Sequence, residues 1–175
     1  MTNPSDTTDT TDTTNPATAI IRPARQTDLP ALVQLIAGIA EFEKLAHKLE
    51  VTEAKLRDAL FCDHPHALCF VVTRADQVVG YTTLFYTFSS FQGRYGLYID
   101  DLYIDPAHRS GGLGQQMMRY IAQYATSQNL GRLEWMVLDW NRRAIDFYET
   151  LGAEALSDWV SYRVEAHQLQ QLANA

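Results

Sequence analysis

The stretch of residues 97–126 most constrains how this chain can fold. An apolar segment with two acids in its middle, Leu-Tyr-Ile-Asp-Asp-Leu-Tyr-Ile (97–104), is followed by Arg-Ser-Gly-Gly-Leu-Gly (109–114) and then by a helical pattern. The glycines allow backbone N–H groups to turn inward, and the start of the helix adds the positive end of its dipole. The pattern therefore predicts a strand leading into an anion-binding loop, with the charge of Arg109 beside it. A plain turn is the alternative, but three Gly and one Arg in a single connection favour the anion site.

Length and charge set the domain organisation. The 175 residues predict a low-complexity disordered tail at 1–19, rich in Asp-Thr-Thr, and a single domain at 20–175. The tail holds no Lys or Arg and no large apolar residue after Met1, so we do not expect it to be a secretory or transit peptide. It carries three Asp, so residues 20–175 have a formal charge of −4 within the total of −7. We therefore expect neither nucleic acid nor membrane as a partner.

Cys62 and Cys69 are the only cysteines, and they form no Cys-x-x-Cys pair. A reducing cytoplasmic location is the expectation. The histidines near them, His64 and His66, follow no zinc spacing, so we predict no metal site. No segment reaches the roughly 20 apolar residues that span a bilayer.

Hydrophobic periodicity and turn residues predict the remaining elements. Strands are expected at 19–23, 67–74, 78–88, 97–104, 132–138 and 159–164, with a tight turn after 74 and a longer loop at 88–96. Helices are expected at 29–40 and 53–61, capped by Thr27 or Asp28 and by Thr52, and then at 112–128, 142–151 and 165–172. This order predicts an α/β fold with a mixed sheet and helices on both faces.

Asp100 and Asp101 stand in the middle of the central strand, where an unpaired carboxylate costs several kcal/mol. A solvated strand edge would explain them without a function. Successive strand residues point to opposite faces, so both acids can line one cleft only if the strand bulges there. Such a bulge would also splay this strand from its neighbour.

Tyr148 lies on the apolar stripe of the helix at 142–151, together with Ala144, Ile145 and Leu151. Spacing alone leaves two interpretations open, a core tyrosine or a functional one.

Two blocks of the sequence resemble the GNAT superfamily of N-acetyltransferases. Arg109-x-x-Gly112-x-Gly114 after an acidic strand is similar to its acyl-CoA motif, and residues 141–153 resemble its second conserved block. The segments 40–45, 88–101 and 138–148 further resemble the diamine (spermidine/spermine) and thialysine branch. The resemblance covers 20–175 and implies the GNAT fold, in which a central mixed sheet splays between two strands.

The resemblance implies acetyl-CoA as the acetyl donor. Its pyrophosphate would lie on the glycine loop, defined here as residues 109–114, and its pantetheine would hydrogen-bond along residues 102–104 like an added strand. The cofactor-binding residues implied are Leu102, Tyr103, Ile104, Arg109, Ser110, Gly111, Gly112, Leu113, Gly114, Asn141, Arg143 and Tyr148. Tyr148 is also the implied catalytic acid, which protonates the leaving thiolate.

The branch acetylates small cationic amines, and a primary amine with a pKa near ~10.4 must lose a proton before it attacks. The implied substrate-binding acids are Glu43, Asp100 and Asp101, with Asp100 as the catalytic group that relays the proton through water. Ser89 and Ser90 stand where polyamine enzymes carry an acid, which favours thialysine or a diamine over spermine. The branch is dimeric, and the apolar strand expected at 159–164 would leave a costly free edge, so we expect a homodimer. Two alternatives remain: a peptide or protein N-acetyltransferase, and a non-catalytic acyl-CoA-binding regulatory module.

Overall fold

The computed structural model describes residues 18–109 and 111–174, which form two compact units. The first unit ends at Met136 and the second begins at Val137. In chain order the elements of the first unit are β1 (Ile20–Pro23), η1 (Gln26–Asp28), α1 (Leu29–Phe42), η2 (Ala46–Lys48), α2 (Glu53–Phe61), β2 (Leu68–Arg74), β3 (Gln77–Ser89), β4 (Arg94–Ile104), η3 (Pro106–His108), α3 (Leu113–Ser127) and β5 (Leu133–Trp135).

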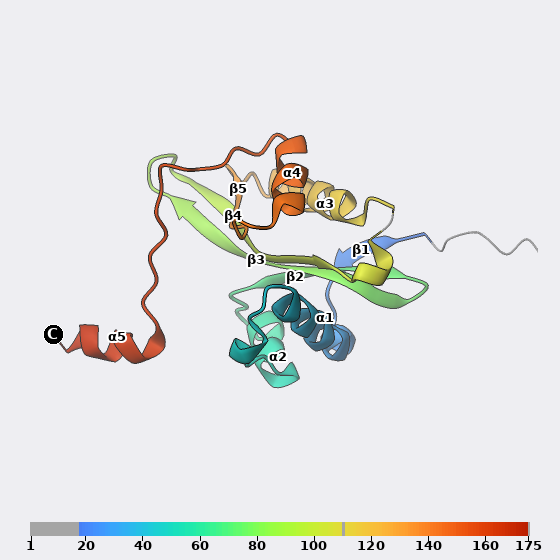
Figure 1. Ribbon diagram of the computed structural model, residues 1–175, viewed down its shortest axis with the longest axis horizontal. Helices are drawn as coiled ribbons and strands as arrows, with labels where there is room; N and C mark the ends of the chain where they lie inside the picture. The colour runs from blue at the N-terminus through green and yellow to red at the C-terminus, as the bar shows by residue number, and fades with distance from the viewer. Residues whose placement is uncertain (1–17, 110, 175) are drawn as a thin grey trace, which may run out of the picture. The chain divides into compact units, whose positions relative to one another are not determined.

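The first unit is built on one five-stranded sheet in the order β1-β2-β3-β4-β5. Strands β1 to β4 pair antiparallel with one another, whereas β5 pairs parallel with β4. The sheet is therefore mixed, as predicted. Helices α1 and α2 cover one face and α3 covers the other (Figure 1). The predicted α/β class with helices on both faces is therefore confirmed.

Apolar side chains of α1 and of the strands form the core between this helix and the sheet. Its buried members are Leu29, Leu32, Leu35, Leu56, Cys69, Val71, Tyr81 and Tyr103. Asp28 precedes α1 but does not cap it with its side chain. Its carboxylate instead accepts hydrogen bonds from Arg22 Nη1 at 2.7 Å and from the Arg25 N–H at 2.7 Å, and the Arg22 guanidinium lowers the pKa of that carboxyl. This ion pair fastens β1 to the start of α1.

Local signals placed most of these elements correctly. The Thr52 hydroxyl accepts from the Lys55 N–H at 3.2 Å and caps α2, as expected. The predicted tight turn between β2 and β3 has positive φ at both Ala75 and Asp76, the geometry that joins two antiparallel strands directly. The predicted loop at 88–96 was wrong: β3 continues to Ser89 and β4 begins at Arg94, because the two strands keep pairing and leave a short connection at 90–93.

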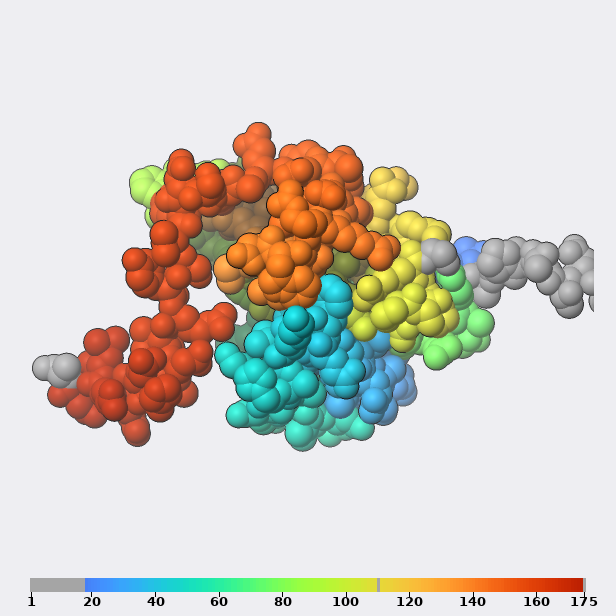
Figure 2. All heavy atoms as spheres, viewed as in Figure 1, coloured from blue at the N-terminus to red at the C-terminus, as the bar shows by residue number. Residues whose placement is uncertain are grey.

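The second unit contains α4 (Arg142–Thr150) and α5 (Ala166–Ala173). Gly152, with φ of +83°, follows the end of α4 as predicted. The strand expected at 159–164 was wrong, since this segment pairs with no strand in the described chain. Its apolar side chains are exposed, and Figure 2 shows the segment as a thin red-orange run of side chains. Without a paired neighbour, β-propensity alone does not create a strand.

The described residues contain no helix long and apolar enough to cross a membrane.

Candidate active site

A β-bulge lies in the middle of β4. On β3, Thr83 faces Asp101 but the next residue, Leu84, faces Ile99, so Asp100 is an extra residue with no opposite partner. The bulge that would let Asp100 and Asp101 line one cleft is therefore present. The parallel pairing of β4 with β5 stops at the same place, because Ile99 opposite Trp135 is its last pair. Pairing of β4 with β5 thus ends at the bulge, as the predicted splay requires.

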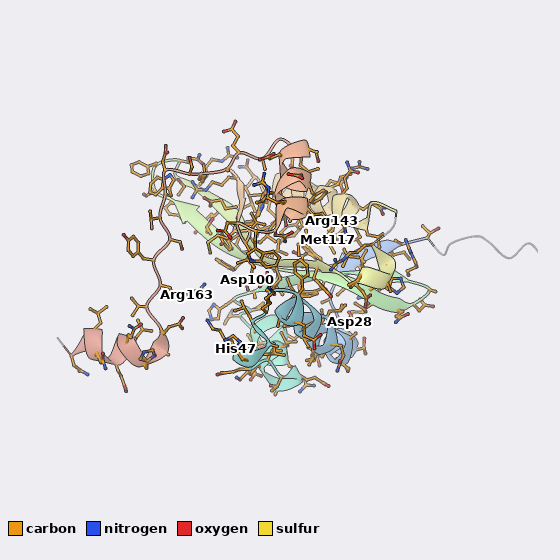
Figure 3. All side chains as sticks on the ribbon, viewed as in Figure 1. Asp28, His47, Asp100, Met117, Arg143 and Arg163 are labelled. Carbon is orange, nitrogen blue, oxygen red and sulfur yellow. The ribbon has the colours of Figure 1, made fainter. Side chains whose placement is uncertain are left out.

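Three carboxylates interact electrostatically at this bulge: Glu43, Asp100 and Asp101, called the acidic cluster below. Glu43 follows α1, and partial burial together with the Asp100 charge raises its pKa. Burial and then the Asp100 charge raise the pKa of Asp101 from 3.8 to about 6, and Glu43 adds to this effect. Figure 3 labels Asp100 at the sheet, on the side of helix α1. A site that raises the pKa of its own carboxyls favours a bound cation.

The two aspartates of the cluster have different surroundings. Asp101 is half-buried and its Oδ2 accepts hydrogen bonds from the Tyr81 hydroxyl at 3.0 Å and the Thr83 hydroxyl at 3.5 Å. Tyr81 is fully buried in the core, so Asp101 is held in a fixed position. Asp100 is exposed. Asp100 is therefore the carboxylate of the cluster that is most open to water.

The segment of β4 beyond the bulge offers backbone groups on its open side. Asp105 donates its N–H to Val79 O, so residues of the same parity, such as Tyr103, turn their polar groups toward β3. Leu102 and Ile104 then direct theirs to the side where pairing with β5 has ended. These are the backbone groups that an added strand or a pantetheine chain could use.

The glycine loop connects β4 to α3. Gly111 and Gly112 have φ of +95° and +70°, which side-chain-bearing residues rarely adopt, and Gly112 is the residue before the first turn of α3. Leu113 is buried and anchors the helix, while Gly114 lies in its first turn. Apart from Gly112 and its two chain neighbours, no described residue has an atom within 4 Å of where a Cβ on Gly112 would stand. The N-terminal N–H groups of α3 are thus accessible to an anion. Ser110, also predicted here, lies outside the described residues.

Arg109 does not extend over the glycine loop. Its Nε donates to Ile104 O at 2.9 Å, and its guanidinium carbon lies 5.6 Å from the Phe42 ring centre and 5.4 Å from the Tyr103 ring centre. These contacts hold the cation between the end of α1 and the face of β4. Arg109 thereby connects the glycine loop to the helix that leads into Glu43.

Arg74 is the residue near the loop that sequence reasoning missed. It ends β2, and its Nη2 lies 3.6 Å from where a Cβ on Gly111 would stand. A basic residue before a hairpin turn carries no sequence signal for this role, because 37 positions separate Arg74 from Gly111 and only the folded sheet brings them together.

The remaining predicted site residues belong to the second unit. Asn141 caps α4, and its Oδ1 accepts from the Ala144 N–H at 3.3 Å. Tyr148 lies seven residues later and therefore on the same face of the helix, whereas Arg143 is exposed. Burial raises the pKa of Tyr148, so its hydroxyl stays protonated well above neutral pH.

Comparisons with known proteins identify the family. Residues 36–153 match the Acetyltransferase (GNAT) family. The chain belongs to the GNAT family. Thialysine N-epsilon-acetyltransferase of Mus musculus is 32% identical over 168 residues, which cover 90% of this chain and 98% of that protein. L-ornithine N5-acetyltransferase of Arabidopsis thaliana is 27% identical over an alignment that covers 87% of this chain and 86% of that protein.

The fold agrees with this assignment. An integron cassette protein from the mobile metagenome of V. cholerae superposes with a TM-score of 0.75 at 25% identity, over 90% of this chain and 98% of that one. GNAT enzymes use acetyl-CoA as acetyl donor, so the predicted class of enzyme, an acetyl-CoA-dependent N-acetyltransferase, is confirmed.

Proposed function

We propose that this GNAT protein transfers the acetyl group of acetyl-CoA to a primary amine of a small cationic substrate, of the thialysine, diamine or polyamine class, by direct attack in a ternary complex. The observation that carries the proposal is the acidic cluster at the β4 bulge, where pairing with β5 ends. The thialysine and ornithine named in the relatives are themselves small molecules with a primary amine, which supports this class.

Electrostatics explain why an acidic cluster suits such a substrate. A free primary amine has a pKa near ~10.4 and arrives as ammonium, which cannot attack a thioester. Glu43, Asp100 and Asp101 would attract the cation and favour its binding over that of a neutral analogue. Asp100 is the exposed member, so we assign to it the relay of the ammonium proton, through water, before attack.

Residues at the open edge of β4 and in the glycine loop would hold the donor. The open-side backbone groups of Leu102 and Ile104, on either side of Tyr103, suit the pantetheine, and the accessible N–H groups around Gly112 suit the pyrophosphate. Acetyl-CoA supplies the acetyl thioester. Asn141 and Arg143 are proposed donor contacts, and Tyr148 is the proposed acid that gives its proton to the departing thiolate.

The test is a turnover screen that uses acetyl-CoA with thialysine, ornithine, diamines, spermidine, a Lys-bearing peptide and a neutral hydroxyl analogue. We expect the small amines to have the highest kcat/KM, and this value should fall as salt rises toward 0.15 M because the cluster acts through a screened field. It should also rise toward alkaline pH as the amine loses its proton. Equal rates with the neutral analogue, or a preference for the peptide, would contradict the proposal.

Two variants separate binding from proton relay. Asp100→Asn should lower kcat more than Asp101→Asn if Asp100 relays the proton, whereas equal increases in KM alone would mean that both only bind the cation. Asp58→Asn, the same change at an exposed position of α2, is the control and should leave both parameters unchanged.

We further propose that the protein works as a cytoplasmic homodimer. The exposed Trp159, Val160 and Tyr162 side chains, 79%, 73% and 91% accessible, support an apolar contact with a second copy. Both cysteines are free thiols, which fits a reducing compartment.

A further inference from the structure

Arg74 places a second positive charge beside the glycine loop. Its guanidinium lies next to Gly111, with Nη2 3.6 Å from the Cβ position of that residue. The end of β2 and the loop before α3 lie at the same end of the sheet (Figure 1). Side chain and loop therefore face one common space in the first unit.

The Nε of Arg74 has no hydrogen-bond partner among the residues that the structure describes. This atom is buried, and the ion pairs found among those residues do not include Arg74. A buried N–H without an acceptor has lost its hydrogen bonds to water without replacement, so native proteins rarely leave one in place without a reason.

The electrostatic surroundings of Arg74 also indicate a missing anion. The loop leads directly into α3, a helix of 15 residues whose N-terminal N–H groups carry partial positive charge. A guanidinium beside the positive end of a helix is repelled unless an anion lies between them. The Arg109 guanidinium is already engaged by Ile104 O and two aromatic rings, whereas the Arg74 guanidinium lies beside Gly111 of the loop.

We propose that Arg74 binds the pyrophosphate of acetyl-CoA, opposite the N–H groups of Gly111, Gly112 and the first turn of α3. This assignment rests on the proposed use of the glycine loop by the donor. A planar guanidinium can give two parallel hydrogen bonds to one phosphate, so Nε and one Nη would be satisfied together. Pyrophosphate is favoured over the more distant 3′-phosphate because Gly111 belongs to the loop itself.

The experiment measures the binding of CoA and of 3′-dephospho-CoA by calorimetry in wild type, Arg74→Gln and Arg74→Lys. Arg57→Gln, the same loss of charge at an exposed position of α2, is the control. Arg74→Gln should weaken both ligands by the same factor, about 10- to 100-fold, and Arg74→Lys should recover part of the loss. Unchanged affinity in Arg74→Gln overturns the proposal, and a loss confined to CoA reassigns Arg74 to the 3′-phosphate and overturns it too.

Two further measurements exclude a merely structural effect. The unfolding midpoint of ligand-free Arg74→Gln should be no lower than that of wild type, because the variant removes a repelled charge; a lower midpoint overturns the proposal. With S-acetyl-pantetheine, which lacks phosphates, kcat/KM should be equal in wild type and Arg74→Gln.

If wild type binds CoA but acetylates no amine, the proposed amine substrate is wrong, and the binding data still decide the role of Arg74.

Discussion

Asp101→Asn should stabilise the free protein at neutral pH. Burial and the neighbouring charges raise the pKa of Asp101 from 3.8 to about 6, so keeping it ionised in the folded state costs free energy. At ~1.4 kcal/mol per pKa unit the difference corresponds to roughly 3 kcal/mol at pH 7. The Tyr81 hydroxyl can still donate to an amide oxygen at this position, although the new NH₂ needs an acceptor, so roughly 3 kcal/mol is an upper value.

The sign of the effect fixes its pH dependence. Between pH 4 and 6 the folded state holds the Asp101 proton and the unfolded state releases it, so this group makes the wild type less stable as pH rises through that window. Below pH 4 both states are protonated and the cost vanishes. The advantage of Asp101→Asn should therefore be small at pH 4 and reach its full value above pH 6.

Urea unfolding at pH 4, 5, 6 and 7.5 measures this difference, with Asp58→Asn as the exposed control. In thermal melts at pH 7.5 the same free energy would raise the midpoint by about 6–12 °C for a chain of this size. A gain that is absent at pH 7.5, or equal at pH 4 and 7.5, would refute the idea that charge at the bulge strains the fold. The gain in stability should accompany a loss of activity, since the strained charge is the one proposed to bind the amine.

Three other predictions concern the donor, the acid and the assembly. Tyr148→Phe should leave the affinity for acetyl-CoA nearly unchanged and lower kcat by about 10² to 10⁴, measured by steady-state kinetics; wild-type turnover would return Tyr148 to a core role. Gly112→Val should abolish measurable acetyl-CoA binding in a calorimetric titration while the fold persists, whereas Gly93→Val, which also has positive φ (+60°) and open space around it, is the control for backbone strain alone. Sedimentation equilibrium at micromolar concentration should show a dimer, and replacing Trp159 and Tyr162 by Ser should shift it toward monomer; a wild-type monomer would contradict the proposal.

Local rules explain why so much of the fold could be predicted from the sequence. Capping by Thr52, the turn at Ala75 and Asp76, and the stop at Gly152 depend on a few neighbouring residues, and the structure has all of them. The bulge at Asp100 was predicted only as the condition for both acids to line one cleft, and the structure contains it. The family resemblance located the same strand and loop.

Pairing partners and long-range contacts were decided only by the tertiary structure. The lengths of β3 and β4 depend on how far two strands keep pairing, and the segment 159–164 forms no strand because propensity without a partner is insufficient. The positions of Arg109 between two rings and of Arg74 beside Gly111 join residues that are distant in sequence. The sequence by itself determined most of the helices and strands and the glycine turn before α3, since these follow from local periodicity and turn residues. Only the packed sheet decided which charges meet, because that depends on register and on burial, which no short stretch of sequence contains.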